Sequence, residues 1–266
     1  MPLNEEGGSF DMKFAVSGKG GVGKTTLSAN LAFQMREKGY NVFAIDADPD
    51  LSLGTVLGLS EEEIENLQPI VEMRDLIVER TQGDGSMYIL NPDVDDVWQD
   101  FSVDVNGIRF LKMGAVKKRG CYCLENTFLN ALINSIVIKA KDAVLLDMGA
   151  GIEHLTRGTV RGIDCLIIVV EPSVVSTDTA KVTRGLAEEI GIKNIYYVGN
   201  KIRNEKEIEF LKTRVPAENI LGCIGYNDYL LDQAMGMADE EGEDKARFDR
   251  DIAAILKSIE DRHGDA

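Results

Sequence analysis

A glycine-rich run near the N-terminus combines the residue types that bind nucleotide phosphates. The run is Gly18-Lys19-Gly20-Gly21-Val22-Gly23-Lys24-Thr25-Thr26, and it follows the apolar residues Phe14 to Val16. Its glycines let successive backbone N–H groups converge on a phosphate, Lys24 reaches the β and γ oxygens, and the Thr25 hydroxyl can bind Mg²⁺. A glycine-rich turn without chemistry would not need this whole pattern. We therefore expect a nucleotide hydrolase that binds ATP or ADP through Gly20 to Thr26.

Acidic residues follow two further apolar runs, where they could bind the magnesium ion of a nucleotide. Asp46-Ala47-Asp48-Pro49-Asp50 follows the second run, and Asp147 ends the run Ala143-Val144-Leu145-Leu146. Mg²⁺ prefers oxygen ligands and keeps several waters, which a carboxylate can orient for in-line attack on a phosphate. We expect Thr25, Asp46 and Asp147 at the Mg²⁺ site, in direct contact or through water. The alternative for the first cluster is a surface turn, because Asp and Pro are ordinary turn residues.

Two cysteines, Cys121 and Cys123, form a Cys-x-Cys pair in a basic stretch that includes Lys117, Lys118 and Arg119. Nearby cations favour the thiolate, which is the form that binds metals. A stable site for a soft metal usually has about four ligands, so one chain supplies part of a site. A twofold homodimer would bring the thiolates of both chains to its axis, where Zn²⁺, Ni²⁺ or an iron–sulfur cluster would fit. Without such a dimer, the pair would be two ordinary loop cysteines.

The elements that must position these residues alternate between strands and helices. Phe14 to Val16 predicts a strand, Thr25 to Lys38 a helix and Asn41 to Asp46 a second strand, which together form a βαβ unit. The later runs of strand length are Gly107 to Met113, Asp142 to Asp147, Asp164 to Val170 and Asn194 to Asn200. This order predicts an α/β fold, a mostly parallel sheet with helices on both faces. The site is then expected at the carboxyl ends of the strands.

The remaining segments are expected to be peripheral. Ser60 to Asp84 has an acidic helical pattern and Met87 to Asn91 predicts a short extra strand, so we expect an insertion and not a second domain. Lys245 to Arg262 predicts a helix that docks on the domain. Its apolar residues are Phe248, Ile252, Ile255, Leu256 and Ile259. We expect one P-loop ATPase domain over residues 12–266, preceded by a disordered extension over residues 1–11.

The composition is typical of a soluble globular protein. Of 266 residues, 44% are hydrophobic and 28% are charged, and the formal net charge is −16. An acidic chain is poorly suited to sequence-independent binding of nucleic acid or anionic lipid, both of which favour a basic surface. Apolar runs are shorter than the roughly 18–20 residues of a membrane helix, and the N-terminus lacks the pattern of a secretory signal. We expect a cytoplasmic protein that binds neither nucleic acid nor membrane, with Cys165 and Cys223 as packing residues.

Lys19 indicates a more specific class of nucleotide-binding protein, because an ordinary phosphate loop does not require a second lysine on the N-terminal side of Lys24. The loop resembles the deviant Walker A loop of MinD, ParA and the nitrogenase iron protein. That resemblance implies that Lys19 crosses a homodimer interface to reach the partner's nucleotide, much as an arginine finger does. Dimerisation would then depend on ATP.

The same resemblance implies roles for individual residues around the nucleotide. Asp48 would position or activate the attacking water and Asp46 would support the metal site, so that Lys19, Lys24 and Asp48 form the catalytic set. Asn200 and Lys201 follow another predicted strand and resemble the position that binds adenine, where the Asn200 amide can both donate and accept a hydrogen bond. A strand-ending turn is the plainer alternative for this pair.

Several longer segments resemble one family of this class, the nickel-insertion accessory ATPases of carbon monoxide dehydrogenase, called CooC. They are Gly18 to Thr26, Asp46 to Asp50, Ile89 to Pro92, Gly120 to Cys123, Asp147 to Gly158 and Asn200 to Asn204, and they span nearly the whole folded chain. Among these segments, the cysteine pair and the stretch after Asp147 are specific to this family within the wider class. In that stretch, Ile152-Glu153-His154 resembles switch II, although His154 by itself is as readily a cap or packing residue as a metal ligand or a switch.

The resemblance implies an ATP-hydrolysing metallochaperone that dimerises with ATP and Mg²⁺, holds Ni²⁺ or Zn²⁺ at Cys121 and Cys123, and delivers nickel to a client enzyme. The client would be carbon monoxide dehydrogenase or the associated acetyl-CoA synthase, which the sequence does not distinguish. The metal also stays open, because thiolates bind zinc as readily as nickel. Two other functions stay open: a MinD/ParA-like nucleotide switch that positions or regulates a partner without metal delivery, and an iron–sulfur scaffold or reductase ATPase.

Overall fold

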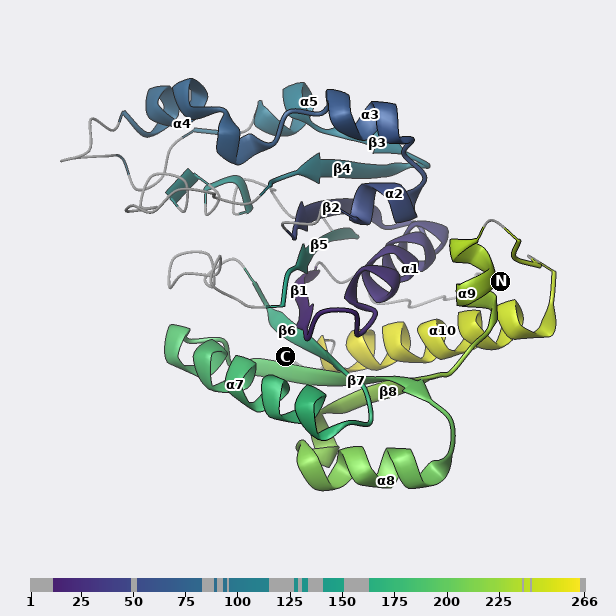
Figure 1. The fold of residues 1–266 in the computed structure, drawn as a ribbon. Helices are drawn as coiled ribbons and strands as arrows, with labels where there is room; N and C mark the ends of the chain where they lie inside the picture. Colours follow the sequence, from purple (N-terminus) through teal and green to yellow (C-terminus); the bar gives the residue numbers. More distant parts are fainter. Residues whose placement is uncertain are drawn as a thin grey trace, which may run out of the picture.

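A single twisted sheet is the frame of the molecule. The computed structural model describes residues 12–48, 52–82, 89, 93–94, 96–114, 127–128, 131–133, 141–150, 163–235, 237–239 and 241–263. Within these residues, eight strands form one sheet in the order β3-β4-β2-β5-β1-β6-β7-β8. All neighbouring strands are parallel except the antiparallel pair β3 and β4. Helices cover both faces (Figure 1), which confirms the predicted α/β fold.

The first βαβ unit forms where its sequence predicts it. β1 (Met12–Gly18) is buried along its whole length, α1 (Lys24–Glu37) follows the glycine-rich loop, and β2 (Asn41–Ala47) runs parallel to β1. Gly39 adopts φ +84° after α1, a left-handed conformation that favours glycine where a helix ends. β5 (Asp142–Met148) inserts between β1 and β2 and pairs with both.

The other strands extend the sheet on both sides of this centre. β4 (Ile108–Lys112) and β3 (Val103–Val105) lie beyond β2, and β6 (Cys165–Val170), β7 (Asn194–Ile202) and β8 (Ile220–Gly225) lie beyond β1. The predicted strands at β4, β5, β6 and β7 are confirmed. β3 and β8 had no predicted counterpart, because β3 is only 3 residues long and β8 contains two glycines, which weaken a strand signal.

Two apolar layers hold helices against the sheet. On one face pack α1, α2 (Leu53–Leu57), α9 (Tyr229–Ala234) and α10 (Glu243–His263). On the other face pack α4 (Arg74–Thr81), α5 (Val97–Phe101), α7 (Val174–Ile190) and α8 (Glu205–Arg214). The peripheral pieces are α3 (Glu61–Asn66) and the 3₁₀ helices η1 (Ile70–Glu72) and η3 (Ala217–Asn219). The central strands are buried on both faces, as expected for a parallel sheet.

The predicted helical pattern of Ser60 to Asp84 is confirmed by α3, η1 and α4. The predicted strand from Met87 to Asn91 and the extension over residues 1–11 lie outside the described residues, apart from Ile89. One P-loop domain over residues 12–266 therefore stays a prediction.

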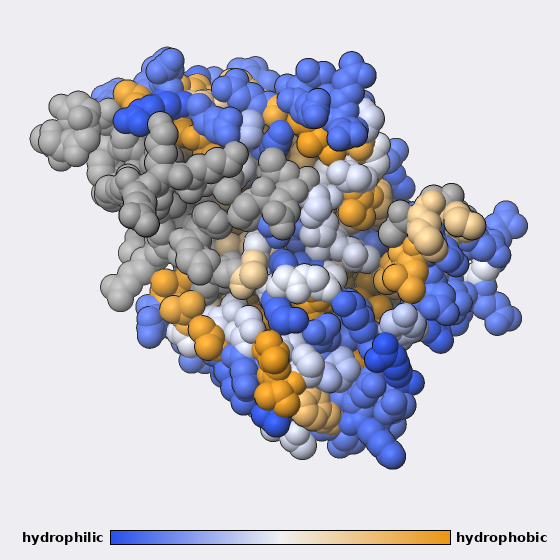
Figure 2. Space-filling view, viewed as in Figure 1, coloured by the Kyte–Doolittle hydropathy of each residue, from blue (hydrophilic) through white to orange (hydrophobic). Residues whose placement is uncertain are grey.

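The C-terminal helix docks as its pattern predicts. The five large apolar residues of α10 that were predicted to dock are all buried, and the helix contacts β8 and α1. Cys165 is buried in β6 and Cys223 packs half-buried against the core, so both are packing residues. Figure 2 shows a row of apolar side chains over α7, where Val175, Val182 and Leu186 are exposed.

Candidate active site

The glycine-rich loop joins β1 to α1 at the carboxyl edge of the sheet. Gly21 (φ +73°) and Gly23 (φ +98°) adopt left-handed backbone conformations that favour glycine. A Cβ atom placed on Gly20 or Gly21 would meet nothing within 4 Å, so these positions border open space. The N–H groups of the first turn of α1 have no partner within the helix. The loop therefore fits a phosphate group, which would take these N–H groups at the positive end of the helix dipole.

Asp147, near the end of β5, lies beside the first turns of α1. Its Oδ2 accepts a hydrogen bond from Thr25 Oγ1 (2.7 Å), and its Oδ1 accepts one from Ser28 Oγ (2.8 Å). The Thr25 hydroxyl also lies 3.2 Å from Ser52 Oγ. A hydroxyl and a carboxylate in this arrangement are the oxygen ligands that suit Mg²⁺, either directly or through water.

Asp46 and Asp48 come from the end of β2, the strand next to β5. Asp46 pairs in register with Asp147. Its carboxylate accepts hydrogen bonds from the backbone N of Asp48 (3.2 Å) and of Leu53 (2.9 Å), so Asp46 fixes the chain that follows β2. Asp48 Oδ2 lies 3.9 Å from Lys24 Nζ. The fold thus brings the predicted acids and the phosphate-loop lysine to one place.

Burial of neighbouring carboxyl groups determines the electrostatics of this place. Asp46 and Asp147 are both fully buried. Burial, followed by the charge of Asp147, raises the pKa of Asp46 to about 7. Burial also raises the pKa of Asp147 to about 6, although hydrogen bonds from Thr25 and Ser28 oppose the shift. A divalent cation beside the pair would favour the deprotonated forms, so these residues fit Mg²⁺.

Asn200 and Lys201, in β7, support the phosphate loop. Asn200 Nδ2 donates a hydrogen bond to the carbonyl oxygen of Val22 (2.8 Å), and Lys201 Nζ donates one to that of Gly21 (2.7 Å). Asn200 is buried against the loop and leaves no room for a Cβ atom at Gly23. Asn200 therefore supports the loop, and its contact with adenine stays a prediction.

Lys19 lies at the start of the same loop and is partly exposed. Its Nζ lies 3.5 Å from Oε1 of Glu171, a residue that directly follows β6. This places Lys19 at the carboxyl edge of the sheet, at the rim of the phosphate site and not inside it.

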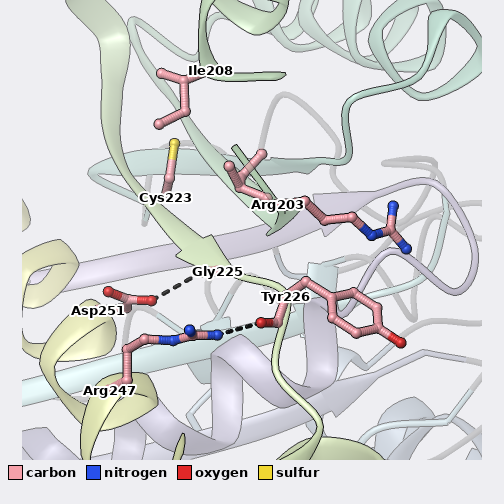
Figure 3. Close-up of a pocket in the computed structure, with 8 residues that line it drawn as sticks. Arg203, Ile208, Cys223, Gly225, Tyr226, Arg247 and Asp251 are labelled. Atoms are coloured by element: carbon pink, nitrogen blue, oxygen red, sulfur yellow. Dashed lines mark hydrogen bonds between the residues drawn. The ribbon is translucent and has the colours of Figure 1, made fainter. Parts of the chain in front are cut away.

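A cavity of about 420 Å³ opens where β7 and β8 end (Figure 3). Its lining residues are Ile202, Arg203, Ile208, Cys223, Gly225, Tyr226, Arg247 and Asp251. The Arg203 guanidinium lies 4.6 Å from the centre of the Tyr226 ring, and Arg247 donates a hydrogen bond to the carbonyl of Tyr226. Arg203 is two residues after Lys201, whose side chain contacts Gly21 of the phosphate loop. An exposed ring with a cation beside it suits a planar aromatic base.

Four of the residues singled out from the sequence, Asp50, Cys121, Cys123 and His154, lie outside the described residues. Among the residues that are described, no group of three or more His, Cys, Asp or Glu side chains is arranged to hold a metal ion. In the same part of the chain, no helix has the length and apolar character needed to cross a membrane. The cysteine metal site therefore stays a prediction.

Three residues of the site carry no motif of their own: Ser28, Ser52 and Glu171. Ser28 is one turn after Thr25 on α1, so helical spacing was a usable signal. Glu171 directly follows β6, and acids at the end of parallel strands are the same signal that identifies Asp46 and Asp147. Ser52 lies between β2 and α2, where spacing gives no signal.

Comparison with known sequences agrees with this geometry. Residues 13–236 match the family described as the CobQ/CobB/MinD/ParA nucleotide binding domain. The chain is 42% identical over 236 residues to the carbon monoxide dehydrogenase accessory protein CooC of Rhodospirillum rubrum, covering 87% of this chain and 88% of that protein. It is 35% identical over 229 residues to an uncharacterized ATP-binding protein of Methanocaldococcus jannaschii, covering 83% of this chain and 87% of that protein.

Solved structures share the fold at lower identity. A chain of the MinC:MinD cell division complex of Aquifex aeolicus aligns with a TM-score of 0.64 and 23% identity, covering 93% of this chain and 95% of that chain. The septum site-determining protein MinD of Pyrococcus horikoshii, complexed with Mg-ADP, aligns with a TM-score of 0.63 and 18% identity, covering 94% of this chain and 96% of that chain. These two establish the fold, and the sequence relatives establish the family. The chain belongs to the CobQ/CobB/MinD/ParA nucleotide-binding family, as an ATP-hydrolysing accessory ATPase of the CooC type.

Proposed function

We propose that the chain is a nucleotide-gated homodimeric metallochaperone, which hydrolyses ATP and inserts nickel into carbon monoxide dehydrogenase or the associated acetyl-CoA synthase. The observation that carries the proposal is the 42% identity, over 87% of this chain, to an accessory protein of carbon monoxide dehydrogenase. The Cys-x-Cys pair supports it, because thiolates are suitable ligands for a carried soft metal. The protein would act in the cytoplasm, where thiols stay reduced.

The site geometry supports hydrolysis of the γ-phosphate of ATP. The N–H groups of Gly20 to Thr26 would hold the phosphates, and Lys24 would neutralise the β and γ oxygens. Mg²⁺, held by Thr25 with Asp147 and Asp46 nearby, would supply the positive charge that stabilises the transition state.

Asp48 would act on the attacking water. Its carboxylate is buried and lies 3.9 Å from Lys24 Nζ, so it is close to the place where the γ-phosphate would dock. The water oxygen bonds to the γ-phosphorus while the bond from that phosphorus to the β–γ bridging oxygen breaks. ADP leaves with the bond electrons, and the proton of the water passes to Asp48 and then to the released phosphate.

The homodimer would couple this reaction to the metal. Lys19 of each chain would reach the nucleotide of the other chain, and its side chain is 38% exposed, so it is accessible to a partner. Closing the dimer would bring Cys121 and Cys123 of both chains together, giving four thiolates for one nickel ion. Hydrolysis would loosen the dimer and release the metal to the client.

The test is anaerobic nickel binding by the full chain with Mg²⁺ and a non-hydrolysable ATP analogue. The wild type should bind one nickel ion per dimer, and the double variant Cys121→Ser/Cys123→Ser should bind none while it still binds the analogue. Cys165→Ala is the matched control, because Cys165 is buried at the start of β6, away from the carboxyl edge of the sheet, and it should bind nickel as the wild type does. Full nickel binding by the double variant would contradict the proposal. A wild-type dimer that binds no metal would favour the nucleotide switch instead, and a brown iron-bearing protein would favour the iron–sulfur scaffold.

A further inference from the structure

Glu171 joins two lysines, one from the phosphate loop and one from β7. Its Oε1 lies 3.5 Å from Nζ of Lys19 in the phosphate loop, and its Oε2 lies 3.5 Å from Nζ of Lys201 in β7. Lys201 Nζ also donates a hydrogen bond to the carbonyl oxygen of Gly21. One carboxylate thus connects β6, β7 and the phosphate loop at the carboxyl edge of the sheet.

The start of α7 holds Glu171 in this position. The backbone N–H of Glu171 donates a hydrogen bond to Ser176 Oγ (3.1 Å), and Ser173 Oγ, which caps α7, lies 3.5 Å from Glu171 Oε1. The carboxylate also lies near the positive end of the dipole of α7, which favours an anion. The Glu171 side chain is only 22% exposed. It is therefore a placed group and not a mobile surface acid.

The ion pair with Glu171 involves Lys19, the residue on which the proposed dimer depends. If Lys19 acts across the interface, its ammonium group has to exchange the carboxylate of its own chain for the phosphates on the partner. An anion that holds Lys19 within one chain therefore opposes closure, and a phosphate-bearing partner has to displace it. Lys201 keeps the other carboxylate oxygen occupied, so Glu171 stays in place when Lys19 leaves.

We propose that Glu171 is a positioning residue of the ATPase cycle, which retains Lys19 in its own chain until a partner with bound ATP displaces it. The proposal rests on the proposed function, because it needs Lys19 to act in the second chain. It adds a group that sets how readily the dimer closes. The bound partner is a second copy of this chain, and the competing ligand is its triphosphate.

The effect of removing the carboxylate can be bounded. Lys19 is 38% exposed, and an ion pair with a solvent-accessible partner shifts an equilibrium by up to about fivefold. Each chain of the dimer contains one such pair, so the two effects multiply. Glu171→Gln should therefore lower the dimer dissociation constant by about 3- to 25-fold at saturating ATP analogue.

The experiment measures the dimer dissociation constant by sedimentation velocity, with Mg²⁺ and a non-hydrolysable ATP analogue at saturation. Glu171→Gln should dimerise more tightly than the wild type, and Glu171→Asp, which keeps the charge, should return toward the wild-type value. Lys19→Met should dimerise poorly, and Lys19→Met/Glu171→Gln should dimerise equally poorly, because the carboxylate acts through Lys19. The matched control is Glu188→Gln on the same helix, which breaks an exposed pair with Arg184 and should change nothing.

The outcomes separate this proposal from the proposed function. If Lys19→Met dimerises as well as the wild type, Lys19 does not act across the interface and the proposed dimer mechanism is wrong. If Lys19→Met fails to dimerise but Glu171→Gln behaves as the wild type or dimerises less tightly, only the role of Glu171 is wrong. The role of Glu171 is also wrong if Lys19→Met/Glu171→Gln dimerises more tightly than Lys19→Met, because the carboxylate would then not act through Lys19.

Discussion

Asp48 is the residue on which turnover should depend most directly. Its carboxylate is buried beside Lys24, and general-base or water-positioning groups contribute about 100- to 10,000-fold to a rate. Asp48→Asn should therefore lower kcat for ATP hydrolysis by about 100-fold or more while ATP binding and ATP-dependent dimerisation persist. Phosphate release measures the first effect and sedimentation the second. Asp75→Asn, which alters an exposed acid on α4, is the control, and rapid hydrolysis by Asp48→Asn would refute the assignment.

Asp46 should make stability depend on pH. Its pKa is raised to about 7 in the folded chain, chiefly by burial, from an ordinary value of 3.8. Between these values the folded chain binds more protons than the unfolded chain, so this carboxyl lowers the free energy of unfolding as pH rises. In metal-free buffer, the stability of the wild type minus that of Asp46→Asn should fall by about 3 kcal/mol from about pH 4 to about pH 7. Urea unfolding at several pH values measures it, and a difference that does not change with pH would contradict the buried charge.

At the scale of elements, the ends of β7 and β8 should bind the nucleotide base. Tyr226 and Arg203 form an exposed aromatic and cationic pair that lines the cavity at these strand ends. Stacking on an aromatic ring contributes about 1–3 kcal/mol per base, so Tyr226→Ala should weaken ATP binding by about tenfold. Binding of inorganic triphosphate, which has no base, should not change.

A second tyrosine and arginine pair provides the control for this prediction. Arg262 lies over the ring of Tyr196 near the opposite end of β7. Tyr196→Ala should leave ATP affinity as in the wild type. If Tyr226→Ala weakens the binding of ATP and of triphosphate equally, the base does not bind at this cavity. The same holds if the variant weakens the binding of neither.

The docking of α10 on β8 should be a large source of stability. Ile255 is fully buried and approaches Gly222 of β8 so closely that no Cβ atom would fit there. Truncation of a fully buried isoleucine costs about 2–5 kcal/mol. Ile255→Ala should lower the free energy of unfolding by that amount, measured by urea denaturation, whereas Lys257→Ala on the exposed face should change it by less than about 0.5 kcal/mol. Similar effects of both variants would mean that α10 does not pack as described.

Long periodic elements could be predicted from the sequence, and short or spatially assembled features could not. Residues 25–38 and 245–262 carry a helical pattern over several turns, and the central strands are continuous apolar runs. β3 and β8 lack such a signal because they are short or contain glycine. The link from Glu171 to Lys19 spans 152 positions in the chain, so only the fold brings these residues together.

At the scale of the molecule, the sheet order explains why a few short motifs determine the site. β1, β2, β5, β6 and β7 all end at one edge, and each contributes a residue or loop to the phosphate site. The motifs alone predicted Lys24, Thr25, Asp46, Asp48 and Asp147 in one cluster, and the hydrogen bonds and the ion pair among them agree. The supporting groups Ser28, Ser52 and Glu171 depend on distances that only the assembled sheet provides.

In the proposed cycle, nucleotide and nickel bind to the same closed dimer. Two binding events linked in this way must strengthen each other by the same factor. The most direct measurement is the dissociation constant for nickel with and without the ATP analogue and Mg²⁺, together with that for the analogue with and without nickel, under anaerobic conditions and with mass followed in solution. We expect equal gains in both affinities, one nickel ion per dimer, and loss of the coupling in Cys121→Ser/Cys123→Ser. Nickel affinity that is independent of the nucleotide would contradict the proposed cycle.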